Sequence, residues 1–328
     1  MPASFRLGAF YFAFFLYVGL MLAYLPAYLA SRGLGAAQIA AVLALPQVVR
    51  MFAPALWGWV ADRTGAQRAI VAAGCAANAL CFLLVPAVSG ALGIALLVGG
   101  MWLDRHAAGM LPPALVLCGL ASLAAAAALP DARLPAAPAA RSFAVPRAAR
   151  RLLACGFCMA AAHGTLYAFF TLHLQRAGYG GTLIGALWTL GVLAEIVVFL
   201  VLPALFRRAS LSAILAASCL IGVLRFLIVG WGVASTWLLV AAQLMHAATF
   251  GAFHAAAVAG VQRLFPQGAH ARGQTLFSSI AYGAGGAAGA LSAGWAWEAG
   301  GPGAAFSLSA LAAALGVFLA YPLKRAGL

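Results

Sequence analysis

Two charged residues lie inside long apolar runs of the sequence, where water does not reach. Glu195 lies within the run 182–203, and Arg225 lies within the run 214–229. A charge at the centre of a membrane helix costs about 2.5–3.5 kcal/mol on insertion scales, so such a residue usually has a partner and a task. The chain has only five acidic residues, and Glu195 is the one that falls inside a predicted span. A carboxyl group in that position can bind and release a proton, so Glu195 is the candidate proton carrier.

Helical geometry allows Glu195 and Arg225 to meet. At ~1.5 Å per residue, they sit roughly 18 Å and roughly 24 Å above the cytoplasmic ends of their spans. Trp188 and Gly191 precede Glu195 at i−7 and i−4, which places them on the same helix face. We therefore predict one shared site, in which Glu195 and Arg225 couple proton movement to transport and Trp188 contacts the substrate.

Polar and aromatic side chains also follow helical spacing on two other spans. Gln243, His246, Phe250 and His254 have the spacing i, i+3, i+7, i+11, so they form one stripe. His163 and Tyr167 are separated by i, i+4 on a different span. We assign His246 and His254 to proton coupling, and we assign His163, Tyr167 and Gln243 to substrate binding. A lone membrane histidine is more often a helix–helix hydrogen-bond partner than a proton relay, and for His163 both interpretations stay open.

A third charge, Arg50, lies in a span between Pro46 and Pro54. An interior arginine does not readily become neutral, so it needs a carboxylate or an anionic ligand. Counting Arg50, Arg225 and Glu195, the membrane interior carries one excess positive charge, which a carboxylate substrate would balance. The alternative is that Arg50 extends toward the membrane surface or binds backbone carbonyls that the two prolines release.

The composition identifies the elements that must position these residues. The chain has 328 residues, of which 66% are hydrophobic and 7% are charged. No soluble core buries that much apolar surface, so we predict an all-α polytopic membrane protein. The net charge of +14 does not indicate nucleic-acid binding, because most basic residues fall in loops on one side of the predicted spans. This positive-inside pattern places both termini in the cytoplasm and the protein in the inner (plasma) membrane.

Hydropathy divides the chain into two groups of spans. We expect about 10–11 transmembrane segments, near 7–30, 37–60, 69–88, 90–103, 109–129, 151–172, 182–204, 210–229, 236–259, 274–296 and 304–322. Residues 130–151 form a basic, proline-rich cytoplasmic linker between an N-terminal bundle (1–129) and a C-terminal six-helix bundle (152–328). Strict alternation would place this linker outside, so we expect one irregular or re-entrant piece within 69–103. The six cysteines lie in apolar spans, where we expect them to pack helices.

The loop after the second span carries a recognisable motif. Its residues are Gly58, Asp62, Arg63, Gly65 and Arg68, with Gln67 at a position that is otherwise basic. The stretch resembles the G-x-x-x-D-R-x-G-x-[R/K]-[R/K] loop of the major facilitator superfamily. The resemblance implies two helical bundles that rock against each other, with this loop as a conformational element. Glycine permits the tight turn and arginine binds lipid phosphate.

In the C-terminal half, the sequence resembles the 3-phenylpropionate transporter branch, whose relatives include lactose-permease-type proton symporters. The matching stretches are 162–167, 185–195, 205–208, 222–225 and 243–254. By comparison with this branch, about one helix is missing near 69–103.

The leading hypothesis is a proton-coupled symporter for a small, possibly aromatic, organic acid. Its expected partners are the substrate, protons and the lipid bilayer, with no nucleic acid, cofactor or metal, and we expect a monomer. Three alternatives stay open: a proton-antiport exporter, a truncated remnant that does not transport, and a membrane enzyme with a metal bound by His163, His246 and His254.

Overall fold

The computed structural model describes the C-terminal half almost completely and the N-terminal half in parts. The described residues are 19, 23–31, 33–64, 69, 72–73, 75–76, 120–121, 124, 145–266 and 268–328, and for residues 53–63 only the backbone is described. Several expectations fall outside these residues. They are most of the irregular piece within 69–103, where a helix of related transporters was expected to be missing, and the linker up to residue 144. The side chains of the loop motif at Gly58, Asp62, Arg63, Gly65 and Arg68 also fall outside.

The chain divides into two compact units. One comprises Met1–Leu34 and Ala53–Ala137, and the other comprises Gly35–Phe52 and Pro138–Leu328. The boundary between Phe52 and Ala53 falls inside helix α2 (Ala36–Thr64), next to Pro54, which has no backbone N–H to donate. The first part of α2 therefore belongs to the same unit as the C-terminal helices.

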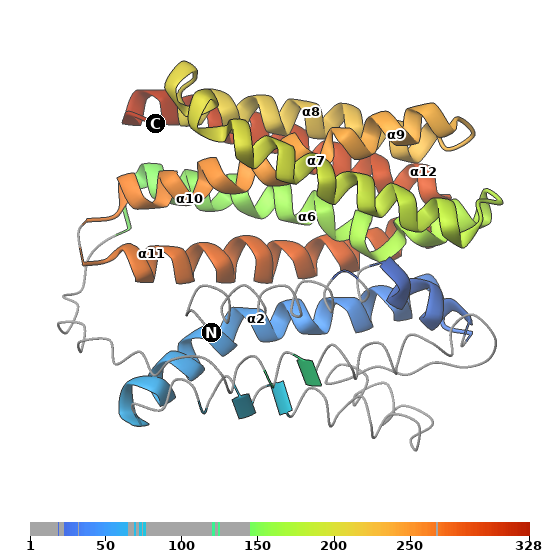
Figure 1. The fold of residues 1–328 in the computed structure, drawn as a ribbon, viewed down its shortest axis with the longest axis horizontal. Helices are drawn as coiled ribbons and strands as arrows, with labels where there is room; N and C mark the ends of the chain where they lie inside the picture. The colour runs from blue at the N-terminus through green and yellow to red at the C-terminus, as the bar shows by residue number, and fades with distance from the viewer. Residues whose placement is uncertain are drawn as a thin grey trace. The chain divides into compact units, whose positions relative to one another are not determined.

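The second unit consists of helices in its described residues (Figure 1). After the first part of α2 they follow in the order α6 (Arg147–Arg176), α7 (Gly181–Arg208), α8 (Leu211–Trp231), α9 (Thr236–Leu244), the π-helix η3 (Ala247–Ala252), α10 (Phe253–Leu264), α11 (His270–Phe277), the π-helix η4 (Ser278–Gly285), α12 (Gly286–Ala320) and the 3₁₀-helix η5 (Tyr321–Ala326).

Local sequence explains where these helices begin and end. The Ser210 hydroxyl accepts a hydrogen bond from the Ala213 N–H at 3.2 Å and caps the start of α8. Gly178 has φ of 86° in the turn between α6 and α7, a backbone conformation that favours glycine. Within α12, Gly301 has φ of 72° and Pro302 follows it, so the helix is broken at this point.

In the described part of the chain, five helical stretches are long and apolar enough to cross a membrane: Arg147–Arg176, Gly181–Arg208, Leu211–Trp231, Thr236–Leu264 and His270–Ala326. The last contains the break at Gly301, so it provides two segments. The helical fold class expected from composition is confirmed. On α7, apolar side chains such as Leu200 and Val197 are exposed on the protein surface, as expected where lipid covers a helix.

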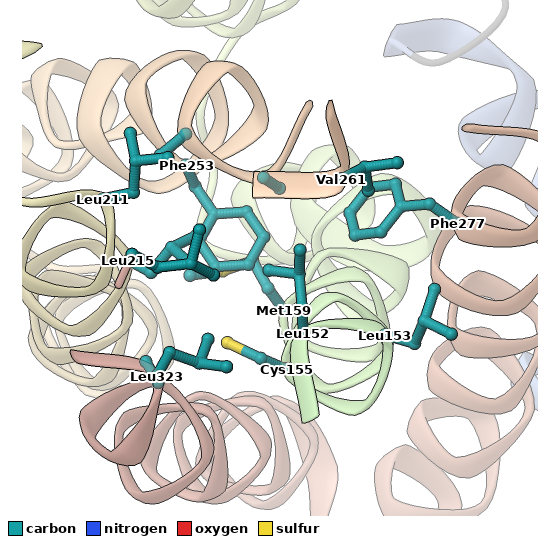
Figure 2. Close-up of a cluster of buried hydrophobic side chains, with 14 of the residues drawn as sticks. Leu152, Leu153, Cys155, Met159, Leu211, Leu215, Phe253, Val261, Phe277 and Leu323 are labelled. Carbon is teal, nitrogen blue, oxygen red and sulfur yellow. The ribbon is translucent and has the colours of Figure 1, made fainter. Parts of the chain in front are cut away.

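A hydrophobic cluster holds one end of this unit together (Figure 2). It contains side chains from α6, α8, α10, α11 and η5, among them Leu152, Cys155, Leu215, Phe253, Val261, Phe277 and Leu323. Cys155 and Cys219 are free thiols 4.0 Å apart, and Cys155 donates to the Gly316 carbonyl. Both thiols are fully buried among apolar neighbours. They pack α6 against α8 and α12.

Glycines let α6 approach η4 and α12 closely. A Cβ at Gly289 would lie 2.0 Å from the Ala161 carbonyl oxygen, and a Cβ at Gly285 would lie 2.6 Å from the Phe157 carbonyl oxygen. A Cβ at Gly164 would in turn lie 2.7 Å from the Ala290 nitrogen. These small residues bring backbones into direct contact, as small-xxx-small spacing does in membrane helices. The contact fixes α6 and its side chains relative to α12.

Candidate functional site

Arg225 is the centre of the buried polar cluster in the second unit. It lies in α8 and is 0% exposed. Its Nε donates to the Ala242 carbonyl at 2.8 Å, Nη1 donates to Thr249 Oγ1 at 3.1 Å, and Nη2 donates to Gln243 Oε1 at 3.1 Å. A fourth contact joins Nη1 to His163 Nε2 at 3.3 Å. All of these partners are neutral acceptors, so they stabilise the position of the guanidinium without cancelling its charge.

His163 has a defined tautomer in this cluster. Its Nδ1 lies 2.9 Å from the carbonyl of Met159, which can only accept, so Nδ1 carries the proton and donates. Its Nε2 then accepts from Arg225. His163 is 3% exposed, and both ring nitrogens are occupied. We predicted that His163 binds substrate; the structure places it where it orients Arg225.

Gln243 connects three helices around the same cation. Its carbonyl oxygen accepts from Arg225 of α8, and its amide nitrogen donates to the Leu187 carbonyl of α7 at 2.9 Å. The side chain is 1% exposed. Gln243 was also predicted to bind substrate, and in this structure its amide oxygen and nitrogen are both engaged by protein groups. It is therefore placed to fix Arg225 and α7 relative to α9.

Glu195 pairs with His246. Glu195 Oε1 lies 2.7 Å from His246 Nε2, with the two side chains 15% and 8% exposed. We expected Glu195 to meet Arg225, but the hydrogen bonds of Arg225 go to neutral groups and the carboxylate is occupied by histidine. Gly191 lies against the same ring, since a Cβ at that position would lie 3.4 Å from His246. The other ring nitrogen of His246, Nδ1, is buried and has no hydrogen-bond partner among the residues that the structure describes.

The predicted stripe on the fourth C-terminal span is present, but part of it lies in a π-helix. The rings of His246 and Phe250 stack at 5.4 Å between centroids, and those of Phe250 and His254 stack at 6.2 Å. η3 contains Phe250 and also Thr249, whose hydroxyl binds Arg225. Short π-helical segments occur frequently at functional sites. The stripe thus runs from the Glu195 pair to His254, whose Nδ1 is hydrogen-bonded to the hydroxyl of Tyr282.

Tyr167 and Trp188 form an aromatic pair beside this cluster. Their rings are nearly parallel, at 17°, with centroids 6.2 Å apart. The Trp188 indole N–H donates to Thr171 at 3.1 Å, and the ring meets Phe170 edge-on. Both rings are half-buried. The ring of Tyr167 also lies 5.9 Å from that of His163, which places it beside the buried cluster.

Arg50 lies on the part of α2 that belongs to the second unit. Its neighbour Met51 accepts a hydrogen bond from Ser279 of η4 at 3.0 Å, which places this turn of α2 against η4. Arg50 is exposed and makes no hydrogen bond or ion pair in the described part of the chain. Its charge acts on the hydroxyl groups of Tyr167 and Tyr282. The alternative in which Arg50 binds backbone carbonyls freed by prolines is not what this structure shows.

Two side chains of the site were missed by sequence reasoning. Thr249 and Tyr282 bind Arg225 and His254 respectively. Thr249 is three residues after His246 and within the stretch that resembles the transporter branch, which was a usable signal. Tyr282 had no comparable signal, because it lies on another span. Among the described residues, no group of three or more His, Cys, Asp or Glu side chains is arranged to hold a metal ion.

Comparison with known proteins decides the family. The sequence pattern of the MFS_1 like family matches residues 4–130 and 141–308. The chain belongs to the MFS_1 like family. A curated relative agrees with the resemblance to the 3-phenylpropionate transporter branch. The "Probable 3-phenylpropionic acid transporter" of Escherichia coli (strain K12) is 38% identical to this chain over 134 residues. These residues are 40% of this chain and 35% of that protein. The aligned stretch therefore spans about a third of this curated relative.

Solved structures support the same fold for this MFS_1 like protein. A mutant of the nucleoside transporter NupG matches with a TM-score of 0.80 at 16% identity, covering 99% of each chain. The human organic anion transporter MFSD10 matches with a TM-score of 0.66 at 16% identity, covering 98% of this chain and all (100%) of that one. At such low identity these matches establish the fold alone. The chain therefore has the fold of major facilitator transporters.

Proposed function

We propose that this protein is a proton-coupled symporter that imports a small aromatic carboxylate across the inner membrane. The observation that carries the proposal is the 2.7 Å contact between Glu195 and His246. It joins the acidic residue of the buried cluster to a histidine whose other nitrogen is free of partners. The ring of His246 lies 5.7 Å from that of His163, which accepts from the fully buried cation Arg225, and neutral groups hold this cation in place.

The Glu195–His246 pair can carry one proton without losing its hydrogen bond. A protonated Glu195 donates to a neutral His246, and an ionised Glu195 accepts from a His246 that bears its proton on Nε2. The net charge of the site therefore changes by one when the pair is loaded. When the helices rearrange, the surroundings of the pair change and the proton leaves on the other side.

The charges of the site select an anionic substrate. When Glu195 is protonated, the site carries two positive charges, one on Arg225 and one on Arg50. Arg50 has no partner among the described residues. A carboxylate binds a guanidinium through two parallel hydrogen bonds, which makes Arg50 the expected ligand. The half-buried rings of Tyr167 and Trp188 offer a stacking surface for an aromatic ring.

The name of the Escherichia coli relative supports the same substrate class. That protein is called a 3-phenylpropionic acid transporter, and its acid combines an aromatic ring with a carboxylate. The proposal gives each part a ligand in this chain: the carboxylate binds Arg50, and the ring packs near Tyr167 and Trp188. The proton-coupling residues are Glu195, Arg225, His246 and His254, with His163 and Gln243 holding Arg225.

Uptake into vesicles tests this function. In proteoliposomes with an acidic exterior, the purified protein should accumulate labelled 3-phenylpropionate above its external concentration, and a protonophore should abolish the accumulation. The physical reason is that substrate and proton move together, so the proton gradient drives the acid inward. Protein-free vesicles provide the control for passive entry of the neutral acid. Extrusion of preloaded acid under the same gradient would show antiport and contradict import.

A further inference from the structure

The hydrogen bond between Tyr282 and His254 joins two helical segments close to Arg50. Tyr282 lies in η4 and His254 in α10, and the hydroxyl of Tyr282 is bonded to Nδ1 of His254. The same segment η4 contacts α2 next to Arg50. Ser279 donates to the Met51 carbonyl, and a Cβ at Gly283 would lie 2.6 Å from the Met51 side chain. Arg50 and Tyr282 are therefore the chain neighbours of Met51 and Gly283, which meet where α2 packs on η4, and the charge of Arg50 acts on Tyr282.

We infer that Tyr282 is a carboxylate-binding residue that acts together with Arg50, an inference that rests on the proposed function. When His254 carries its proton on Nδ1, it donates to the phenol oxygen and leaves the phenol O–H free to donate. A substrate carboxylate bound by Arg50 then accepts this O–H. The two hydrogen bonds, from His254 to Tyr282 and from Tyr282 to the carboxylate, polarise and strengthen each other. Tyr282 thus distinguishes a carboxylate from a neutral group at the same position.

Binding measurements on Tyr282→Phe test this role. We expect the Kd for 3-phenylpropionate to rise about tenfold, because one charge-assisted hydrogen bond is lost. The Kd for the neutral 3-phenylpropanamide should change much less, because its amide oxygen is a weaker acceptor than a carboxylate and forms a weaker hydrogen bond with the phenol O–H. Tyr321→Phe is the matched control, since Tyr321 is exposed outside the site, and it should leave both Kd values unchanged.

The outcomes separate this inference from the proposed function. If the unaltered protein does not bind 3-phenylpropionate at all, the proposed function is wrong. If it binds, and Arg50→Gln weakens binding while Tyr282→Phe does not, the proposed function stands and the inference about Tyr282 is wrong. An equal loss for the acid and the amide in Tyr282→Phe would also contradict the inference, because it would indicate a purely structural role.

A different observation concerns the start of α2. The first turn of α2 contains no acidic residue, yet a carboxylate near a helix N-terminus is stabilising. Glu298 of α12 supplies one: its Oε1 accepts from the Ala37 N–H at 2.9 Å. Below this contact the helices meet closely, since a Cβ at Gly294 would lie 2.5 Å from that of Ala40, and Ala44 packs on Ala287 and Ala290.

We propose that Glu298 is a latch that holds the first part of α2 on α12 and releases when the extracellular side opens. The glycine and alanine contacts are apolar and weakly directional, so they permit separation. The Glu298 contact is directional and charge-assisted, and it forms only when α2 is seated. It therefore biases the protein toward the state seen here without preventing the transition.

Cysteine accessibility tests the latch. In a chain with its six native cysteines replaced, a reporter Ala287→Cys is buried at this contact. With Glu298→Ala, a membrane-impermeant maleimide should alkylate the reporter roughly threefold to tenfold faster from outside. Glu298→Gln, which keeps an acceptor but not the charge, should give an intermediate rate.

The matched control is Gln38→Ala. Gln38 caps the same helix end by accepting from the Gly35 N–H at 2.9 Å, but this bond lies within one segment. Its removal should not change the alkylation rate. Equal rates in the Glu298 variants and the unaltered protein would contradict the latch, and so would an equal acceleration by Gln38→Ala.

Discussion

Glu195→Gln is expected to abolish proton-driven accumulation of substrate while leaving substrate exchange intact. Glutamine has nearly the same shape and can donate its amide N–H to His246 Nε2, so the contact with His246 is retained. It cannot bind or release a proton. Net transport requires proton release on the cytoplasmic side, whereas exchange of internal for external substrate does not. Accumulation should fall at least to the level set by passive equilibrium, and exchange should remain within about a few-fold of the unaltered rate.

Parallel measurements of accumulation and counterflow in the same vesicles check this prediction. Glu195→Asp is the matched variant, because it retains a titratable carboxyl group on a shorter side chain and should keep part of the accumulation. Loss of both accumulation and exchange in Glu195→Gln would assign Glu195 to substrate binding or to folding. Full accumulation in that variant would place the coupling proton elsewhere.

The second large effect is expected for Arg225→Met, which should lose both stability and transport. The substitution removes the donors for the Ala242 carbonyl, Gln243 and Thr249 in a fully buried site. Each buried acceptor that is left unsatisfied costs about 1–3 kcal/mol, so the sum is large compared with the marginal stability of a folded protein. The variant should unfold at a lower temperature in detergent, and its transport should be undetectable.

Two further variants make the Arg225 prediction specific. Arg207→Met removes an exposed arginine at the end of α7 and should change neither quantity. The double variant Arg225→Met with Gln243→Leu removes both members of one hydrogen bond, so it should recover part of the lost stability without recovering transport. If Arg225→Met is as stable as Arg207→Met, the buried cluster does not hold these helices together.

The sequence was sufficient to predict the fold class and to point to several residues of the buried cluster. Apolar runs identified the helices, and charges inside those runs identified Glu195 and Arg225, because a charge in such a position is costly and rarely incidental. Helical spacing also predicted that His246, Phe250 and His254 share a face, and their rings stack in the structure. These features depend on one helix at a time, which is why a single sequence reveals them.

Pairing between helices was not predictable in the same way. Glu195 binds His246, whereas Arg225 donates to neutral groups, among them Thr249 in the π-helix η3. A residue pattern with a 3.6-residue period contains no signal for a π-helix. Backbone acceptors such as the Ala242 carbonyl are also invisible in residue types, although they complete the surroundings of Arg225.

Arg50 shows both what the sequence predicts from one helix and what it does not predict about contacts between helices. The sequence placed this cation inside a span and predicted its need for an anion, and the structure leaves it without a partner in the described residues. What the sequence did not indicate is that the first part of α2 joins the unit of the C-terminal helices and brings the turn that carries Arg50 against η4, which carries Tyr282. The helix contact that does so depends on Gly283 and Ser279, residues with no chemistry of their own to draw notice.

The most direct test of proton coupling is to count protons and substrate together. Proteoliposomes in a weakly buffered medium that contains a membrane-impermeant pH-sensitive dye should show external alkalinisation when 3-phenylpropionate is added, in a fixed ratio to the labelled acid taken up. The Glu195→Gln protein should exchange labelled acid in the same vesicles with no alkalinisation. Proton uptake that persists in this variant at the unaltered ratio would contradict the role of the Glu195–His246 pair.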